Sequence, residues 1–211
     1  MKEYNILNID LQKIGEEVRN GKIIVYPTDT VYGLAGNFHD LNSIKKIYSI
    51  KERNFNSPLI ALVSDIKYVS EIAFIDDEKF EIFEKLAKHF WPGGLTIILN
   101  KKDNVPAIMV SNGNTVGVRI PNLQLSIDII ESCGGILPTT SANISGEKTP
   151  KSFNEISEEI KKRCDLLIDA GECKIGEAST IIDLTKQTPK IIREGVIKKE
   201  NLEKIIGKIE R

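Results

Sequence analysis

The sequence is poor in the residues that build metal centres and disulfide frameworks. Its 211 residues include three cysteines, Cys133, Cys164 and Cys173, an odd number with no C-x-x-C spacing. The two histidines, His39 and His89, lie far apart and have no Glu or Cys at ligand spacing. These absences argue against a disulfide scaffold, a zinc site and a histidine triad. We therefore predict no metal held by protein ligands and a reducing, cytoplasmic location.

An excess of one charge and a long apolar run are also missing. The chain has 29 Lys and Arg against 30 Asp and Glu, so its net charge is -1. The electrostatic footprint of a protein whose main role is to bind nucleic acid is therefore absent, although a local basic groove stays compatible with this balance. No apolar stretch approaches the roughly 20 residues that span a bilayer, and "MKEYNILNIDLQ" lacks the apolar segment of a signal peptide. We expect no membrane association.

Helix and strand patterns alternate along the chain, with no repeat and no linker, so we expect one domain over residues 1–211. Strands are predicted at 22–27, 58–63, 95–99, 115–121, 134–139, 166–170, 179–184 and 190–194. Helices are predicted at 10–21, 43–51, 66–73, about 80–90, after Asn122, after Ser152, and at 198–211 at the C-terminus. The pattern indicates an α/β fold (α+β in some schemes): a three-layer domain with a twisted, mixed parallel and antiparallel sheet flanked by helices.

Several residues are expected at defined places in these helices. Asp10 and Asn122 are candidate N-caps, and Ser152 with Glu155 has the spacing of a capping box. Phe80 is expected to face the core together with Phe83, Ala87 and Phe90.

The strand "TVGVRIP" presents an arginine beside a glycine. Because side chains alternate along a strand, one face carries Val116, Val118 and Ile120 and the other carries Thr115, Gly117 and Arg119. The missing side chain at Gly117 leaves room for a ligand, and the planar guanidinium of Arg119 suits a carboxylate or a phosphate. The alternative is a solvent-facing Arg next to a glycine bulge.

The segment "PTTSANISG" follows the apolar run "GGILP" and is almost entirely polar. If it stays extended, Thr139, Ser141 and Asn143 point the same way and offer two hydroxyls and an amide to a ligand. The alternative is a turn in which Ser and Asn bond their own backbone.

Three further segments carry candidate ligand-binding residues, each ambiguous alone. The segment "PTDTVYG" contributes Thr28, Asp29, Thr30 and Tyr32, or is an ordinary hairpin turn. "KERNFNSPL" places Lys51 and Arg53 where a helix ends, which suits an anion or a solvated helix terminus. "GEASTIIDL" and "IIREG" place Ser179, Thr180 and Arg193 on or beside late strands.

Together these segments resemble the threonylcarbamoyl-AMP synthases of the YrdC type, from about Gly21 to Val196. The matching blocks are "PTDTVYGL", "KER" with "PL", "FWPGGLTIIL", "VGVRIP", "SANISG", "ASTIIDL" and "REG". The resemblance implies a YrdC-like fold and the synthesis of threonylcarbamoyl-AMP and pyrophosphate from L-threonine, bicarbonate and ATP. It also implies Mg²⁺ held mainly by the nucleotide phosphates, and transfer of the product to tRNA by a downstream threonylcarbamoyl transferase complex.

The resemblance also assigns residues. Catalysis falls to Lys51, Arg53 and Arg119; L-threonine binding to Thr30, Tyr32, Arg119, Thr139 and Ser179; and ATP binding to Lys51, Arg53, Ser57, Thr115, Ser141, Asn143 and Arg193. Two features differ from the family pattern. Asn54 stands where the family usually has Pro, and the expected form is the short one, without the extra domain of the longer branch. Two alternatives stay open: a noncatalytic module that binds double-stranded RNA or tRNA, weakly if at all, and the carbamoyl-adenylate domain of a hydrogenase-maturation enzyme.

Overall fold

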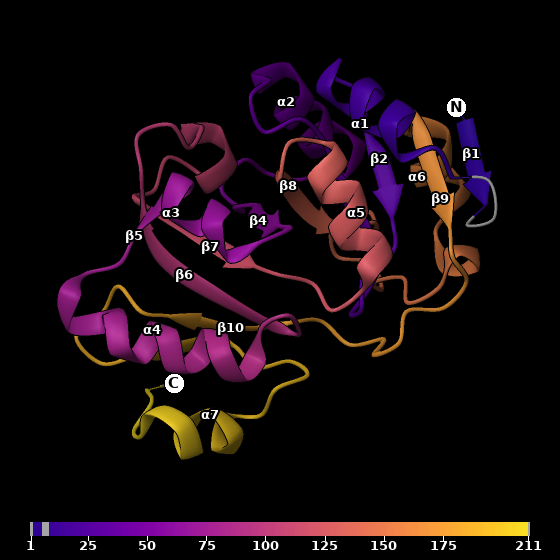
Figure 1. The fold of residues 1–211 in the computed structure, drawn as a ribbon. Helices are drawn as coiled ribbons and strands as arrows, with labels where there is room; N and C mark the ends of the chain where they lie inside the picture. The colour runs from indigo at the N-terminus through magenta and orange to yellow at the C-terminus, as the bar shows by residue number, and fades with distance from the viewer. Residues whose placement is uncertain (1, 6–8, 211) are drawn as a thin grey trace.

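The computed structural model describes residues 2–5 and 9–210, which fold around one mixed sheet (Figure 1). The strands are β1 (Lys2–Asn5), β2 (Ile24–Tyr26), β3 (Gly33–Ala35), β4 (Ile60–Val63), β5 (Ala73–Phe74), β6 (Leu95–Lys101), β7 (Thr115–Arg119), β8 (Ile136–Ser141), β9 (Leu166–Asp169), β10 (Thr180–Asp183) and β11 (Lys190–Arg193). Their order across the sheet is β1-β9-β2-β3-β8-β4-β7-β6-β10-β11, and β5 pairs with β6.

The pairing confirms the mixed sheet. The parallel pairs are β1–β9, β2–β9, β4–β7 and β6–β10. The antiparallel pairs are β2–β3, β3–β8, β4–β8, β6–β7, β10–β11 and β5–β6. Strands β1, β3 and β5 were not predicted, because they are two to four residues long and "GLA" of β3 has no β-branched residue.

Alternating side chains of the strands feed two apolar cores on opposite faces of the sheet. In β2, Ile24 and Tyr26 belong to the core that contains Ile14 of α1 and Ile129 of α5, whereas Val25 belongs to the other core. The helices are α1 (Leu11–Arg19), α2 (Leu41–Ile50), α3 (Val69–Ile72), α4 (Asp77–Phe90), α5 (Gln124–Ser132), α6 (Glu158–Arg163) and α7 (Lys199–Ile206), with 3-10 turns η2 (Ile66–Tyr68), η3 (Ala107–Val110) and η4 (Phe153–Glu155). Helices on both faces give the predicted three layers.

Helix starts are only partly as predicted. Asp10 caps α1, since its carboxylate accepts the Lys13 N–H at 3.0 Å. Asn122 does not cap α5, whose N-cap residue is Leu123.

The capping box predicted at Ser152 is also wrong. Ser152 precedes only the short turn η4, and Glu155 accepts the Lys151 N–H at 2.9 Å instead of closing a box. The helix α6 begins later, where the Ser157 hydroxyl accepts the Ile160 N–H at 3.3 Å. Spacing alone did not distinguish two serines five residues apart.

Two predictions about helices α4 and α7 are wrong. Phe80 of α4 is 49% exposed, whereas Phe83 and Ala87 of the same helix are buried. The final helix α7 is shorter than the expected 198–211, because Gly207 takes a φ of +81° that ends it. Ile209 is nevertheless buried beyond the helix, and residue 211 lies outside the described residues.

Candidate active site

A polar cleft crosses one face of the sheet from β3 to β11. Its volume is about 180 Å³. The lining residues are Thr28, Thr30, Val31, Tyr32, Gly33, Arg53, Pro58, Ile60, Leu62, Arg119, Thr139, Thr140, Ser141, Thr149, Ala178, Ser179, Ile181 and Arg193. The sheet order therefore brings five separate stretches of sequence to one place.

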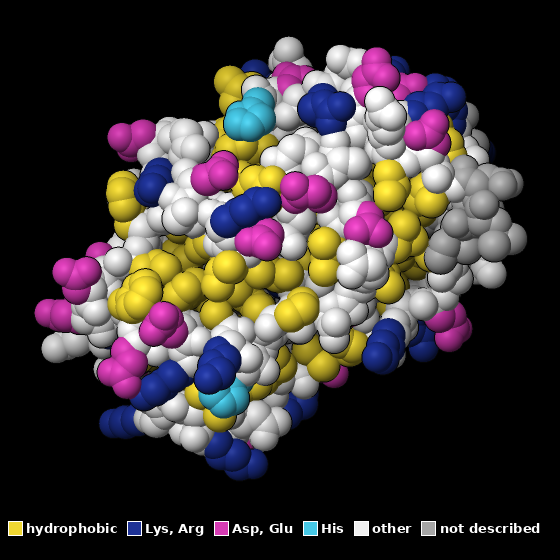
Figure 2. All heavy atoms as spheres, viewed as in Figure 1, with side chains coloured by type: hydrophobic (Ala, Val, Ile, Leu, Met, Phe, Trp, Pro, Cys, Tyr) yellow, Lys and Arg dark blue, Asp and Glu magenta, His cyan; other side chains and the backbone are white. Residues whose placement is uncertain are grey.

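A second, larger hollow of about 1010 Å³ lies between α3, α4 and α5. Its lining includes the apolar residues Val69, Phe83, Trp91 and Ile120. Figure 2 shows hydrophobic side chains gathered in a band across this face of the molecule. Charged residues border it but do not converge in it. Because binding sites combine a concave surface with convergent polar groups, the smaller cleft is the candidate site.

Three arginines converge on the cleft, and each donates to a hydroxyl. The pairs are Arg53 Nη1 to Thr140 Oγ1 at 2.9 Å, Arg119 Nη1 to Thr30 Oγ1 at 2.7 Å, and Arg193 Nη2 to Ser179 Oγ at 3.2 Å. Burial lowers the pKa of each guanidinium, and the positive charges of Arg119 and Arg53 lower the pKa of Arg193 further. Crowded cations of this kind favour an anion between them.

Arg119 is held on the side away from the cleft by Asp29. The Arg119 side chain is 3% exposed; its Nε donates to the Gly93 carbonyl at 2.8 Å, and its Nη2 donates to Asp29 Oδ1. A guanidinium has five N–H groups, so one remains on each terminal nitrogen after these bonds and the bond to Thr30. Two such N–H groups can grip a carboxylate.

Lys51 lies beneath the end of β8 rather than in the cleft. It is 1% exposed, and its Nζ donates to the carbonyls of Ser141 and Asn143, the latter at 2.6 Å. Within the described residues no carboxylate pairs with it. Burial, and then the positive charge of Arg53, lowers the pKa of Lys51 to about 7. The ammonium is therefore only partly charged near neutral pH.

The end of β8 presents hydroxyls to the cleft, but its amide turns away. Thr139, Thr140 and Ser141 all line the cleft, so the predicted alternation of side chains between the two faces does not hold for the last three residues of β8. Asn143 is 8% exposed, and its Nδ2 donates to the carbonyls of Ile144 and Glu147, both at 2.9 Å. Its amide therefore shapes the loop, as in the turn alternative; its contact with a nucleotide stays a prediction.

Two further predicted nucleotide residues, Thr115 and Ser57, lie outside the cleft lining, as Lys51 and Asn143 do. Thr115 occupies the opposite end of β7 from Arg119. Ser57 borders the Arg53 side, where its carbonyl accepts Arg53 Nε at 3.1 Å. Gly117 is absent from the lining too, since a Cβ there would lie 3.2 Å from the Ile60 and Thr96 side chains. The side chains of Ile60 and Thr96 therefore pack close to Gly117, where the sequence predicted room for a ligand.

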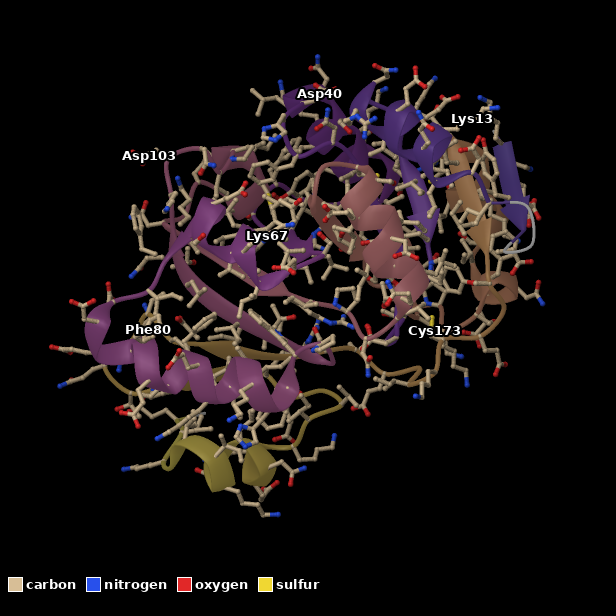
Figure 3. All side chains as sticks on the ribbon, viewed as in Figure 1. Lys13, Asp40, Lys67, Phe80, Asp103 and Cys173 are labelled. Carbon is tan, nitrogen blue, oxygen red and sulfur yellow. The ribbon has the colours of Figure 1, made fainter. Side chains whose placement is uncertain are left out.

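Tyr32 lines the cleft, but its hydroxyl is bonded to the backbone of the segment after β9. The hydroxyl donates to the Gly171 carbonyl at 3.0 Å and accepts the Ala170 N–H at 3.1 Å. Cys173, labelled in Figure 3, follows on the same segment after β9. Cys133, Cys164 and Cys173 are free thiols, and burial raises the pKa of each, to about 11, 12 and 11.

Sequence reasoning missed Thr140 and Thr149, which line the cleft, and Asp29 and Tyr26, which contact cleft residues from outside the lining. Asp29 and Tyr26 were within quoted segments but had no assigned role, and Thr140 was excluded by strict alternation. Thr149 lies in a segment without a recognised pattern. The pairing of Asp29 with Arg119 joins residues 90 positions apart, so no local pattern reports it.

Within residues 2–5 and 9–210, no three His, Cys, Asp or Glu side chains gather as they would around a metal ion. Within the same residues, no helix has both the length and the apolar composition needed to cross a bilayer.

Comparisons with known proteins relate this chain to one family. Residues 16–195 match the Sua5/YciO/YrdC family model, described as "Telomere recombination". The threonylcarbamoyl-AMP synthase of Pyrococcus abyssi is 38% identical over 192 residues, which cover 91% of this chain and 56% of the relative. A putative threonylcarbamoyl-AMP synthase of Methanocaldococcus jannaschii is 39% identical over 189 residues, which cover 89% of this chain and 86% of the relative.

A solved structure shares the whole architecture. Sua5 of Pyrococcus abyssi complexed with L-threonine matches with a TM-score of 0.92 at 36% identity, covering 100% of this chain and 62% of that one. The chain thus spans a little over half the length of the Pyrococcus relative, so the fold is shared over the matched part only.

Proposed function

Because the chain belongs to the Sua5/YciO/YrdC family, we propose that it is an L-threonylcarbamoyladenylate synthase, a nucleotidyltransferase that acts in tRNA modification. The substrates are L-threonine, bicarbonate and ATP, and the products are threonylcarbamoyl-AMP, pyrophosphate and water. One observation carries the proposal: three guanidiniums and a row of hydroxyls share a single small cleft. A downstream threonylcarbamoyl transferase complex is the proposed recipient of the product.

The amino acid occupies the part of the cleft around Arg119. The two remaining N–H groups of Arg119 bind the threonine carboxylate, and Asp29 fixes the guanidinium from the opposite side. Thr30, Thr139 and Ser179 bind the amine and the hydroxyl, and the Tyr32 ring forms one wall. A volume of about 180 Å³ suits an amino acid and lies below the roughly 300 Å³ at which drug-sized ligand pockets begin.

ATP must therefore extend beyond the enclosed volume. Arg53 and Arg193 border the open sides and bind phosphate oxygens, while Lys51 acts from beneath Ser141. The other proposed nucleotide contacts are Ser141, Asn143, Ser57 and Thr115. Ser57 and Thr115 do not line the cleft, so they would contact a part of the nucleotide that extends beyond it. The cleft cations suit a polyanion because several charge-assisted bonds can form at once.

Catalysis rests on position and charge. The threonine amine adds to CO2 derived from bicarbonate, and a carbamate oxygen then attacks the α-phosphate of ATP, whose bond to pyrophosphate breaks. Arg119 aligns the amino acid, while Arg53 and Arg193 neutralise the charge that develops on the pyrophosphate. The nearly complete burial of Thr30, Tyr32 and Arg119 keeps water from the carbamate and the mixed anhydride.

Magnesium fits as an ion that enters with the nucleotide. Asp29 is the carboxylate in contact with the cleft arginines, and it is bound to Arg119 beneath the surface. The polar side chains in the cleft are thus hydroxyls and guanidiniums, which leaves the phosphate oxygens and water as the proposed ligands. The ion would offset triphosphate charge.

Pyrophosphate release tests the proposal directly. We expect release from ATP only when L-threonine and bicarbonate are both present, together with a product of the mass of threonylcarbamoyl-AMP. Arg119→Lys keeps the charge but loses the planar fork, so it should raise the KM for threonine at least tenfold, by roughly the 1.5–3 kcal/mol of a hydrogen bond to a charged group. Equal release without amino acid, or with no bicarbonate in degassed buffer, would refute the proposal.

A further inference from the structure

A buried phenol touches one of the cleft hydroxyls from below. Tyr26 of β2 is fully buried, and its Oη lies 3.0 Å from Thr139 Oγ1 of β8. The contact is tight on all sides, because a Cβ on Gly33 would lie 3.0 Å from Thr139 Cγ2 and 3.1 Å from Tyr26 Cε1. Tyr26 does not line the cleft, so any effect it has on a ligand passes through Thr139.

The direction of this hydrogen bond follows from counting protons. Thr139 Oγ1 also lies 3.0 Å from the Leu137 carbonyl, which can only accept, so the single Thr139 proton goes there. Tyr26 must then be the donor to Thr139. The reverse direction would leave the phenolic proton buried without an acceptor among the described residues, an arrangement that proteins avoid.

Thr139 therefore has no proton left for the cleft. Its oxygen receives one bond from Tyr26 and keeps one lone pair free. Burial raises the pKa of Tyr26, so the phenol keeps its proton and its donor role. At this point the cleft can only accept a hydrogen bond from a ligand.

We propose that Tyr26 is a specificity-determining positioning residue: its bond holds the Thr139 hydroxyl with its proton on the Leu137 carbonyl and its free lone pair toward the cleft, and so selects an amino acid that presents a hydrogen-bond donor there. The inference rests on the proposed function, because it concerns the threonine subsite. The donor is either the threonine hydroxyl or its ammonium group. A carboxylate or phosphate oxygen is rejected at this position, which orients the amino acid with its carboxylate toward Arg119.

The test is a double-mutant cycle read by calorimetric binding of L-threonine. Tyr26→Phe removes only the hydroxyl and should weaken threonine binding about fivefold, the effect of one typical hydrogen bond, while ATP affinity stays within about twofold. Thr139→Val should weaken threonine binding at least as much. Because Tyr26 acts through Thr139, the double variant should match Thr139→Val alone.

Matched controls separate this role from a structural one. Tyr48→Phe also removes a buried phenol, one that donates to the Ser57 and Ile108 carbonyls, and should leave threonine affinity unchanged. L-valine, which keeps the ammonium and lacks the hydroxyl, identifies the donor. Its binding is insensitive to Tyr26→Phe if Thr139 accepts from the hydroxyl, and weakens in parallel with threonine if Thr139 accepts from the ammonium.

Two results overturn the inference alone: unchanged threonine affinity in a Tyr26→Phe variant that is only less stable, or additive losses in the double variant. If the unmodified protein binds no L-threonine, the proposed function itself fails, and the inference falls with it.

Discussion

Lys51 is a buried cation whose environment offers carbonyl oxygens and no acid. Its Nζ contacts the carbonyls of Ser141 and Asn143, and its pKa is lowered to about 7 against 10.5 for an ordinary lysine. The unfolded chain thus binds more protons than the folded chain between about pH 7 and 10.5. By linkage, the contribution of this residue to stability rises with pH across that window and is smallest below pH 7.

A bound polyanion should counteract the lowering of the Lys51 pKa. If ATP phosphates lie near Lys51, they raise its pKa, so the complex takes up a proton when it forms at pH 8. We expect uptake approaching one proton per ATP at that pH and a progressive loss of ATP affinity as the pH rises above 7. Calorimetry in buffers of different ionisation enthalpy measures the uptake. The matched variant Lys51→Gln should abolish it, and an equal uptake in that variant would show that another group titrates.

At the scale of elements, the end of β8 separates two kinds of polar residue. Ser141→Ala removes a hydroxyl that lines the cleft, so turnover should fall more than tenfold with little change in melting temperature. Asn143→Ala removes two bonds to the Ile144 and Glu147 carbonyls and should cost about 1–3 kcal/mol of stability. For a chain of this size, that predicts a melting temperature lower by about 2–12 °C.

Differential scanning fluorimetry and pyrophosphate release on the same two variants check this contrast. A stable Asn143→Ala variant with lost turnover would instead place Asn143 among the ligand contacts.

Elements rich in β-branched residues were predictable from the sequence, and short ones without them were not. "LTIIL" and "STIIDL" form β6 and β10 as predicted, because Ile and Thr fit a pleated, half-buried surface. "GLA" of β3 is a strand only because β2 and β8 pair with it on both sides. In the site, Arg119 and Thr139 followed from strand alternation and family resemblance. Asp29 and Tyr26 did not, since their partners lie 90 and 113 positions away.

At the scale of the molecule, a ligand in the cleft joins strands from distant parts of the sheet. Thr30 lies beside β3, Arg119 on β7, and Arg193 on the edge strand β11. Binding of ATP with threonine should therefore slow amide hydrogen exchange in β10 and β11, because local opening of that edge breaks ligand contacts. Amides of β2, buried in the interior of the sheet, serve as the internal control. Protection confined to residues 27–32 would contradict a ligand that spans the cleft.

The order of the strands has a consequence for how the chain reaches its native state. Among the described residues the N-terminal strand β1 pairs only with β9, more than 160 residues later, and the cleft is complete only when Arg193 is in place. Such non-local pairings lose loop-closure entropy before their stabilising contacts form, so folding is expected to be slow for a domain of this size. During synthesis, the hydrogen-bonding edge of β2 must wait for β9 to emerge, which is a period of exposure to aggregation. Catalytic activity would then be a late marker of folding, since Arg193 lies on β11, the last strand along the chain.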